Sequence, residues 1–236
     1  IQPESIDPRH RSDYRGSWSA VVASLKCCCD RRRRLSPITS LSAEFAARAV
    51  VERAARVRSL ALISPTGFSA RQPPQGPATD RILKVLRLPL LGKGLYRVLT
   101  SRPSIRYFLG QAFAGETPPA LIDYAHETAH QPGARHAPIR FLSMKLFTPS
   151  ALESLYAPLE IPTLVLYDTD PNISFERLDT VEARPNWRLE RISPTRGLPH
   201  WEKPAETCDA LLGCQASTDP CEGPNPNLVC REDIDD

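Results

Sequence analysis

The chain has 236 residues, enough for one large core or for a core with a lid, and its 41% hydrophobic and 24% charged residues are an ordinary globular balance. A net charge of +3 is too small for the chain as a whole to be a nucleic-acid binder. No apolar run reaches the roughly 18 residues of a membrane span and no signal peptide is visible, so we expect no transmembrane helix and a cytoplasmic location.

The first 39 residues are basic and rich in cysteine, and we expect them to be irregular, with at most a short helix at Ser17–Leu25. Arg31–Arg34 is interpreted as a solvated loop rather than a nuclear-localisation signal. The chain has seven cysteines without a C-x-x-C pair, so a zinc site is not expected. The last four could pair as disulfides, but free thiols are favoured: Cys208, Cys214, Cys221 and Cys230.

Hydrophobic periodicity predicts helices and strands in alternation after residue 40. A helix over 42–56 leads at once into an apolar strand over 57–64, which is half of a βαβ unit. Residues 161–167 form a second buried strand, 186–192 an edge strand and 205–212 a final helix. We therefore expect an α/β protein whose core is 40–68 and 157–212. Residues 69–156, cut by prolines, would form a helical cap, and 213–236 a disordered polar tail.

Three side chains stand where predicted strands give way to loops or helices, in the order Ser42, Asp170, His200. A serine nucleophile needs a base to take its proton and an acid to orient that base, and the three could fill these roles. Ser42 at a helix start would leave the N–H of Ala43 as an oxyanion donor. Each residue also has a plain structural alternative, as helix cap, turn residue or surface histidine, and Asp168 competes with Asp170.

The segment Ser40–Ala49 (SLSAEFAARA) resembles the nucleophile region of a bacterial subgroup of the α/β-hydrolases. The segments 59–68, 99–109 and 198–202 support the resemblance, which covers about three quarters of the chain. It implies an eight-stranded, mostly parallel sheet with a helical cap. It also implies that Ser42 is the nucleophile, His200 the base and Asp170 the acid.

The sequence departs from that pattern in two places. Glu44 stands where a small residue usually lets the nucleophile turn tightly. Four arginines and Pro37 precede Ser42, a poor composition for a buried central strand. We therefore expect the first strands of the fold to be missing or degraded, in an N-terminally truncated or frame-damaged copy.

The predicted function is a serine hydrolase that cleaves an ester or related acyl bond of a small apolar substrate through an acyl-enzyme. The alternative is a catalytically inactive hydrolase-like protein or truncated remnant. No cofactor and no metal are expected, because His126 and His130 have no clear carboxylate partner. Nucleic acid is not an expected partner, and the sequence leaves the oligomeric state open.

Overall fold

The computed structural model describes residues 35–53 and 57–218. The expected helix at Ser17–Leu25, the Cys27–Cys29 and Arg31–Arg34 runs and most of the polar tail lie outside the described residues. Within the described ranges, no helix is both long and apolar enough to cross a membrane.

Four parallel strands form the centre of the fold, and they pair across the sheet in the same order as in the chain. They are β1 (Leu35–Thr39), β2 (Ser59–Ile63), β3 (Thr163–Tyr167) and β4 (Trp187–Arg191). Each crossover carries helices, as parallel pairing requires. The predicted α/β class, with a parallel sheet and flanking helices, is confirmed.

Helices cover both faces of this sheet. On one face, Leu60 and Leu62 of β2 pack in a buried cluster with α2 (Ser42–Val51) and the π-helix η1 (Leu152–Tyr156). On the other face, Ala61 and Ile63 pack with α10 (Pro204–Thr218). The alternation along β2 follows from the two-residue period of a strand, and its continuous burial explains why the sequence there is almost entirely apolar.

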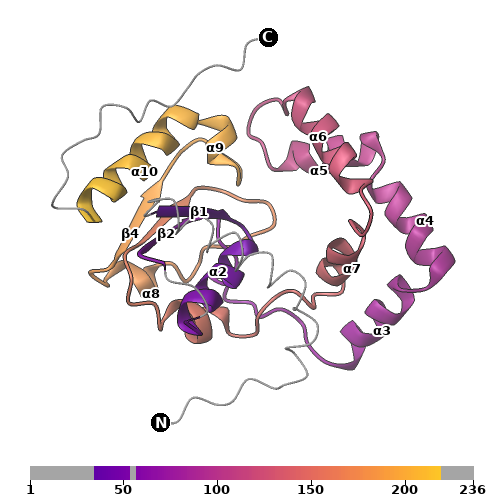
Figure 1. Cartoon of the computed structure of the whole chain (residues 1–236), viewed down its shortest axis with the longest axis horizontal. Helices are drawn as coiled ribbons and strands as arrows, with labels where there is room; N and C mark the ends of the chain where they lie inside the picture. Colours follow the sequence, from indigo (N-terminus) through magenta and orange to yellow (C-terminus); the bar gives the residue numbers. More distant parts are fainter. Residues whose placement is uncertain (1–34, 54–56, 219–236) are drawn as a thin grey trace.

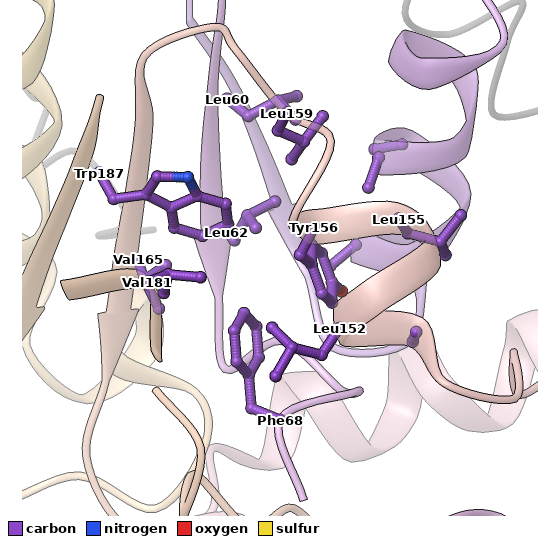
Figure 2. Close-up of a cluster of buried hydrophobic side chains, with 14 of the residues drawn as sticks. Leu60, Leu62, Phe68, Leu152, Leu155, Tyr156, Leu159, Val165, Val181 and Trp187 are labelled. Carbon is purple, nitrogen blue, oxygen red and sulfur yellow. The ribbon is translucent and has the colours of Figure 1, made fainter. Parts of the chain in front are cut away.

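Three aromatic rings fill the centre of the first cluster (Figure 2). Phe68 stacks on Tyr156 with ring centroids 4.7 Å apart, and Trp187 meets both rings edge-on at 6.3 Å. The Tyr156 hydroxyl donates to the carbonyl of Thr66 at 2.9 Å, which satisfies its polar end. The cluster therefore joins the loop after β2, η1 and the start of β4 into one packed unit.

The segment between β2 and η1 carries five helices, which form an arc beside the sheet (Figure 1). Prolines begin three of them, because a first helical residue needs no N–H donor and prefers the φ that proline fixes. The helices are α3 (Pro77–Leu86), α4 (Pro89–Leu99), α5 (Arg102–Gln111), α6 (Pro119–Ala129) and α7 (His136–Leu142). Two short helices, α8 (Asp179–Glu182) and α9 (Pro199–Glu202), flank β4.

Several details differ from the sequence-based expectations. Leu35–Thr39 was expected to be irregular but forms β1, with Pro37 exposed. Among the described strands β1 has a neighbour on one side only, a position in which the missing proline N–H breaks no ladder. The π-helix η1 was assigned to the cap, yet its buried side chains belong to the sheet cluster.

The C-terminal helix and the cysteines also differ. Helix α10 continues to Thr218, past the predicted end at Leu212. Cys208 is disulfide-bonded, whereas Cys214 is a buried free thiol. The free-thiol expectation therefore holds for Cys214 and fails for Cys208.

Candidate active site

The carboxyl ends of the four strands lie along one edge of the sheet, because all four strands run in the same direction. In open parallel sheets, ligands bind outside this edge. Ser40 and Ser42 follow β1, Asp168 and Asp170 follow β3, and His200 follows β4. The topology therefore brings every predicted catalytic side chain to the same edge.

Ser40 occupies the turn between β1 and α2 in a left-handed conformation, with φ of 54°. This backbone region costs a non-glycine residue about 1–3 kcal/mol and is found mainly where the surrounding structure enforces it. The Ser40 N–H donates to the carbonyl of Ile63 at 2.8 Å, which fixes the turn against the end of β2. A strained serine on a tight strand-to-helix turn is the geometry of a nucleophile elbow.

Ser42, the predicted nucleophile, is the exposed first residue of α2. The N–H of Ala43, the predicted oxyanion donor, is engaged within the turn and donates to the carbonyl of Ser40 at 3.0 Å. The N–H of Glu44 likewise donates to the carbonyl of Leu41 at 3.2 Å. The N–H of Leu41, the residue directly after Ser40, has no backbone acceptor in this turn.

Asp168 is buried, and both of its oxygens are occupied. Oδ2 accepts the N–H of Thr195 at 2.8 Å, and Oδ1 accepts from Nε of Arg191 at 2.7 Å. Burial acts to raise the pKa of Asp168, but the hydrogen bonds from Thr195 and Arg191 outweigh it and lower that pKa. Asp168 therefore holds the start of the loop after β4 against the end of β3.

Asp170 is half-buried and faces the loop that carries the histidine. Its Oδ1 accepts the N–H groups of Asn172 and Ile173 at 2.7 and 3.0 Å. Its Oδ2 lies against Gly197, where a Cβ would collide with the carboxylate, and Gly197 has φ of 106°. Burial raises the pKa of Asp170, partly offset by the two N–H groups. Asp168 therefore contacts the start of the histidine loop at Thr195, whereas Asp170 lies against Gly197, three residues before His200.

His200 lies in α9 and is half-buried. Its Nδ1 atom is buried and has no hydrogen-bond partner among the described residues. Burial lowers the pKa of His200, so the imidazole is neutral at neutral pH, as a general base must be. A buried imidazole nitrogen normally has a hydrogen-bond partner. The unpartnered Nδ1 of His200 is therefore the atom to which the carboxylate of a catalytic triad would bond.

Two carboxylates that the sequence analysis did not assign to the site hold its surroundings. Glu202 accepts the N–H of Arg196 at 2.8 Å through Oε2 and the N–H of Ala114 at 2.5 Å through Oε1. It therefore ties the histidine loop to the loop between α5 and α6. No sequence signal predicts this, because the partners are backbone groups of a distant segment.

Glu44 is the second of these carboxylates, and only 2% of it is exposed. Thr66 donates to its Oε1 at 2.5 Å, and the N–H of Thr148 donates to its Oε2 at 2.7 Å. Its place in the first turn of α2, next to the positive end of the helix dipole, favours a carboxylate there. The Glu44 that departs from the small-residue pattern therefore joins the start of α2 to the loop after β2 and to the segment that follows α7.

Metal ligands are not grouped in the described residues, where no cluster of three or more histidine, cysteine, aspartate or glutamate side chains could hold an ion. His126 of α6 and His130, just after that helix, have ring centroids 4.3 Å apart with the rings tilted by 34°, and His130 Nδ1 bonds to the backbone carbonyl of His126. The side chains that form the candidate site are therefore a serine (Ser40 or Ser42), the neutral His200 and an acid (Asp168 or Asp170).

Solved structures whose fold superposes on this chain include several hydrolases. A bacterial membrane phospholipase A, a virulence factor, superposes with a TM-score of 0.58 at 24% identity, over 86% of this chain and 63% of that chain. An α/β-hydrolase fold protein from Burkholderia ambifaria gives 0.56 at 16%, over 90% and 75% of the two chains. A serine hydrolase involved in carbazole degradation gives 0.54 at 12%, over 78% and 63%.

The sheet order, the flanking helices and these likenesses identify the α/β-hydrolase fold. The chain spans less than two thirds of the length of the phospholipase that it resembles. No protein-family model matches the sequence, and no curated protein matches it.

Proposed function

We propose that the chain is a serine hydrolase that cleaves an ester or related acyl bond of a small apolar substrate. The observation that carries the proposal is Ser40, a non-glycine residue with φ of 54° at the turn between a parallel strand and a helix. In a nucleophile elbow, a turn of this kind presents the serine hydroxyl at a helix N-terminus, where an oxyanion can be stabilised.

Ser40 is therefore our preferred nucleophile, and Ser42, which the sequence favoured, is the second candidate. Ser40 Oγ would attack the acyl carbon, and the N–H of Leu41 would donate to the oxygen that becomes negative. With Ser42 as nucleophile the corresponding donor would be the N–H of Ala43, which already donates to the Ser40 carbonyl. The turn geometry thus supports Ser40.

His200 would take the proton of the serine and return it to the leaving alcohol, and would then activate the water that releases the acid. Asp170 would accept a hydrogen bond from the Nδ1–H of His200 and hold the ring in the correct tautomer. The orphan Nδ1 and the contact of Asp170 with Gly197 support this assignment. Asp168 is less suited because Thr195 and Arg191 occupy both of its oxygens.

Labelling with a fluorophosphonate, read by intact mass, tests the proposal on three proteins: the wild type, Ser40→Ala and Ser42→Ala. We expect one adduct on the wild type and on Ser42→Ala, and none on Ser40→Ala. Since alanine and serine tolerate the turn equally, both variants should melt as the wild type does. If only Ser42→Ala lost the adduct, the nucleophile would be Ser42 and not Ser40.

The alternative is a catalytically inactive hydrolase-like protein or a truncated remnant. It is favoured by the outer edge of β1, which no described strand covers. In the family, strands and a loop beyond this edge supply the second oxyanion donor. A chain that melts cooperatively and takes no adduct on any serine would support this alternative.

A further inference from the structure

The corner between α3 and α4 exposes a run of large apolar side chains. Leu90 is 89% exposed, Val98 65% and Leu91 60%, and Leu88 and Val85 are about half exposed. These values are high for aliphatic residues, which folding normally removes from water. We call these five residues the apolar corner; they belong to α3, α4 and the link between them, helices that lie in the part of the arc away from the sheet (Figure 1).

The packing of α4 directs these residues outward. Gly92 faces inward and lies so close to the carbonyl of Leu86 that a side chain there would collide. Leu90, Gly94 and Val98 are four residues apart and share the opposite face, and the space beside Gly94 is open. The exposure therefore follows from the close packing of α4 on the end of α3.

Cations surround the apolar corner. Residues 77–99 contain five lysines and arginines, all exposed, and one acid, Asp80. Asp80 is bound by Lys145 at 2.7 Å, so it does not neutralise the corner. None of the five cations forms an ion pair with another described residue: Arg81, Lys84, Arg87, Lys93 and Arg97.

We propose that the apolar corner docks on the surface of an anionic lipid bilayer. Aliphatic side chains flanked by lysine and arginine are the composition of helices that lie in a membrane interface, with the apolar groups among the acyl chains and the cations at the lipid phosphates. The proposal concerns attachment to a surface, and the proposed chemistry of Ser40 is not needed for it.

Other occupants fit less well. A second copy related by a twofold axis would bring the five cations against themselves, which is repulsive. A nucleic acid would match the charge but would leave Leu90 and Val98 without apolar contacts, since bases stack on aromatic rings. An anionic lipid surface offers phosphates to the five cations and acyl chains to the aliphatic side chains at the same time.

Vesicle flotation with the full chain tests the proposal at about 0.1 M salt. We expect binding to vesicles of 70% phosphatidylcholine and 30% phosphatidylglycerol, little binding to pure phosphatidylcholine, and partial release at high salt. Each cation near such a surface contributes about fivefold in affinity, so Lys93→Gln/Arg97→Gln should weaken binding by roughly tenfold or more. Leu90→Ser/Leu91→Ser should weaken it at least as much.

Matched controls carry the same changes elsewhere. Arg58→Gln/Arg71→Gln removes two exposed cations outside α3 and α4, and Tyr124→Ser removes an exposed ring of α6. Both variants should bind as the wild type does. Ser40→Ala should also bind normally, which separates this test from that of the hydrolase. No binding to anionic vesicles, or equal loss in the controls, would overturn the proposal. So would a self-association in sedimentation velocity that Leu90→Ser/Leu91→Ser abolishes.

Discussion

Glu44 is an acid inside the protein, held by a hydroxyl and an N–H group. Burial raises its pKa above the usual 4.5, although Thr66, Thr148 and the nearby Arg48 act in the opposite direction. The folded protein therefore keeps the Glu44 proton at pH values where the unfolded chain has lost it. It follows that this residue makes folding less favourable as the pH rises through and above 4.5.

Replacing Glu44 by glutamine should remove this pH dependence. The amide oxygen can accept from Thr148 N–H and the amide nitrogen can donate to the Thr66 hydroxyl, so both contacts survive. We expect the melting temperature of the wild type to fall relative to that of Glu44→Gln as the pH is raised from about 4.5 towards 8. Glu116→Gln, at an exposed acid, is the control and should follow the wild type. A constant difference between wild type and Glu44→Gln would contradict the shifted pKa.

At the scale of single residues, the sequence placed the candidate side chains at one edge of the sheet but could not choose between close neighbours, and the preference for Ser40 is our proposal. Ser40 and Ser42 differ in backbone conformation and in exposure, and Asp168 and Asp170 differ in their partners, Thr195 and Arg191 for the first and Gly197 for the second. These partners lie at the end of β4 and in the loop after it, more than twenty residues later in the chain. A local pattern contains no information on such contacts, whereas His200 had no competitor nearby.

Among the elements, the loop between β4 and α9 carries the histidine and depends on one glycine. Gly197 has φ of 106°, and its α-carbon lies against the carboxylate of Asp170. Glycine is needed there for two independent reasons, the positive φ and the lack of room for a Cβ. The loop can therefore reach Asp170 only with this residue.

Gly197→Ala should displace the histidine loop from Asp170. The strained backbone alone costs about 1–3 kcal/mol, and the collision adds to it. We expect a lower melting temperature and slower fluorophosphonate labelling of Ser40. Gly115→Ala, at a glycine with open space and no positive φ, should change neither. If Gly197→Ala labels at the wild-type rate, the contact with Asp170 has no part in positioning His200.

Elements with a strong apolar pattern could be predicted from the sequence, and the others could not. β2 and β3 are buried on both faces, so their apolar runs identified them within two residues at each end. β1 was missed because it borders arginines and contains Pro37, which is tolerated where one side of the strand is unpaired. In α3 and α4 the large apolar residues Ile82, Val85 and Val98 are exposed, so the hydrophobic pattern of these helices does not indicate which face is buried.

Over the whole molecule, two carboxylates tie the arc of helices to the sheet, one near the end of the arc and one in its middle. Glu44 holds Thr148 near the end of the arc, and Glu202 holds Ala114 in its middle. Through Arg196, Glu202 also fixes the loop that leads to His200. Glu202 thus holds both the helical arc and the loop of the candidate base, so we expect a movement of one to displace the other.

Glu202→Gln should loosen both of these loops at once. A glutamine has one acceptor oxygen in place of two and carries no charge, so one of the two N–H groups loses its partner, at a cost of about 1–3 kcal/mol, and the other keeps a weaker, neutral bond. We expect the amides of Ala114 and Arg196 to exchange hydrogen faster, measured by mass spectrometry on peptides covering each loop. Glu206→Gln, at an exposed acid of α10 paired with Lys203, should leave both loops unchanged. Faster exchange in only one loop would mean that Glu202 supports that loop alone, and that the arc and the histidine move independently.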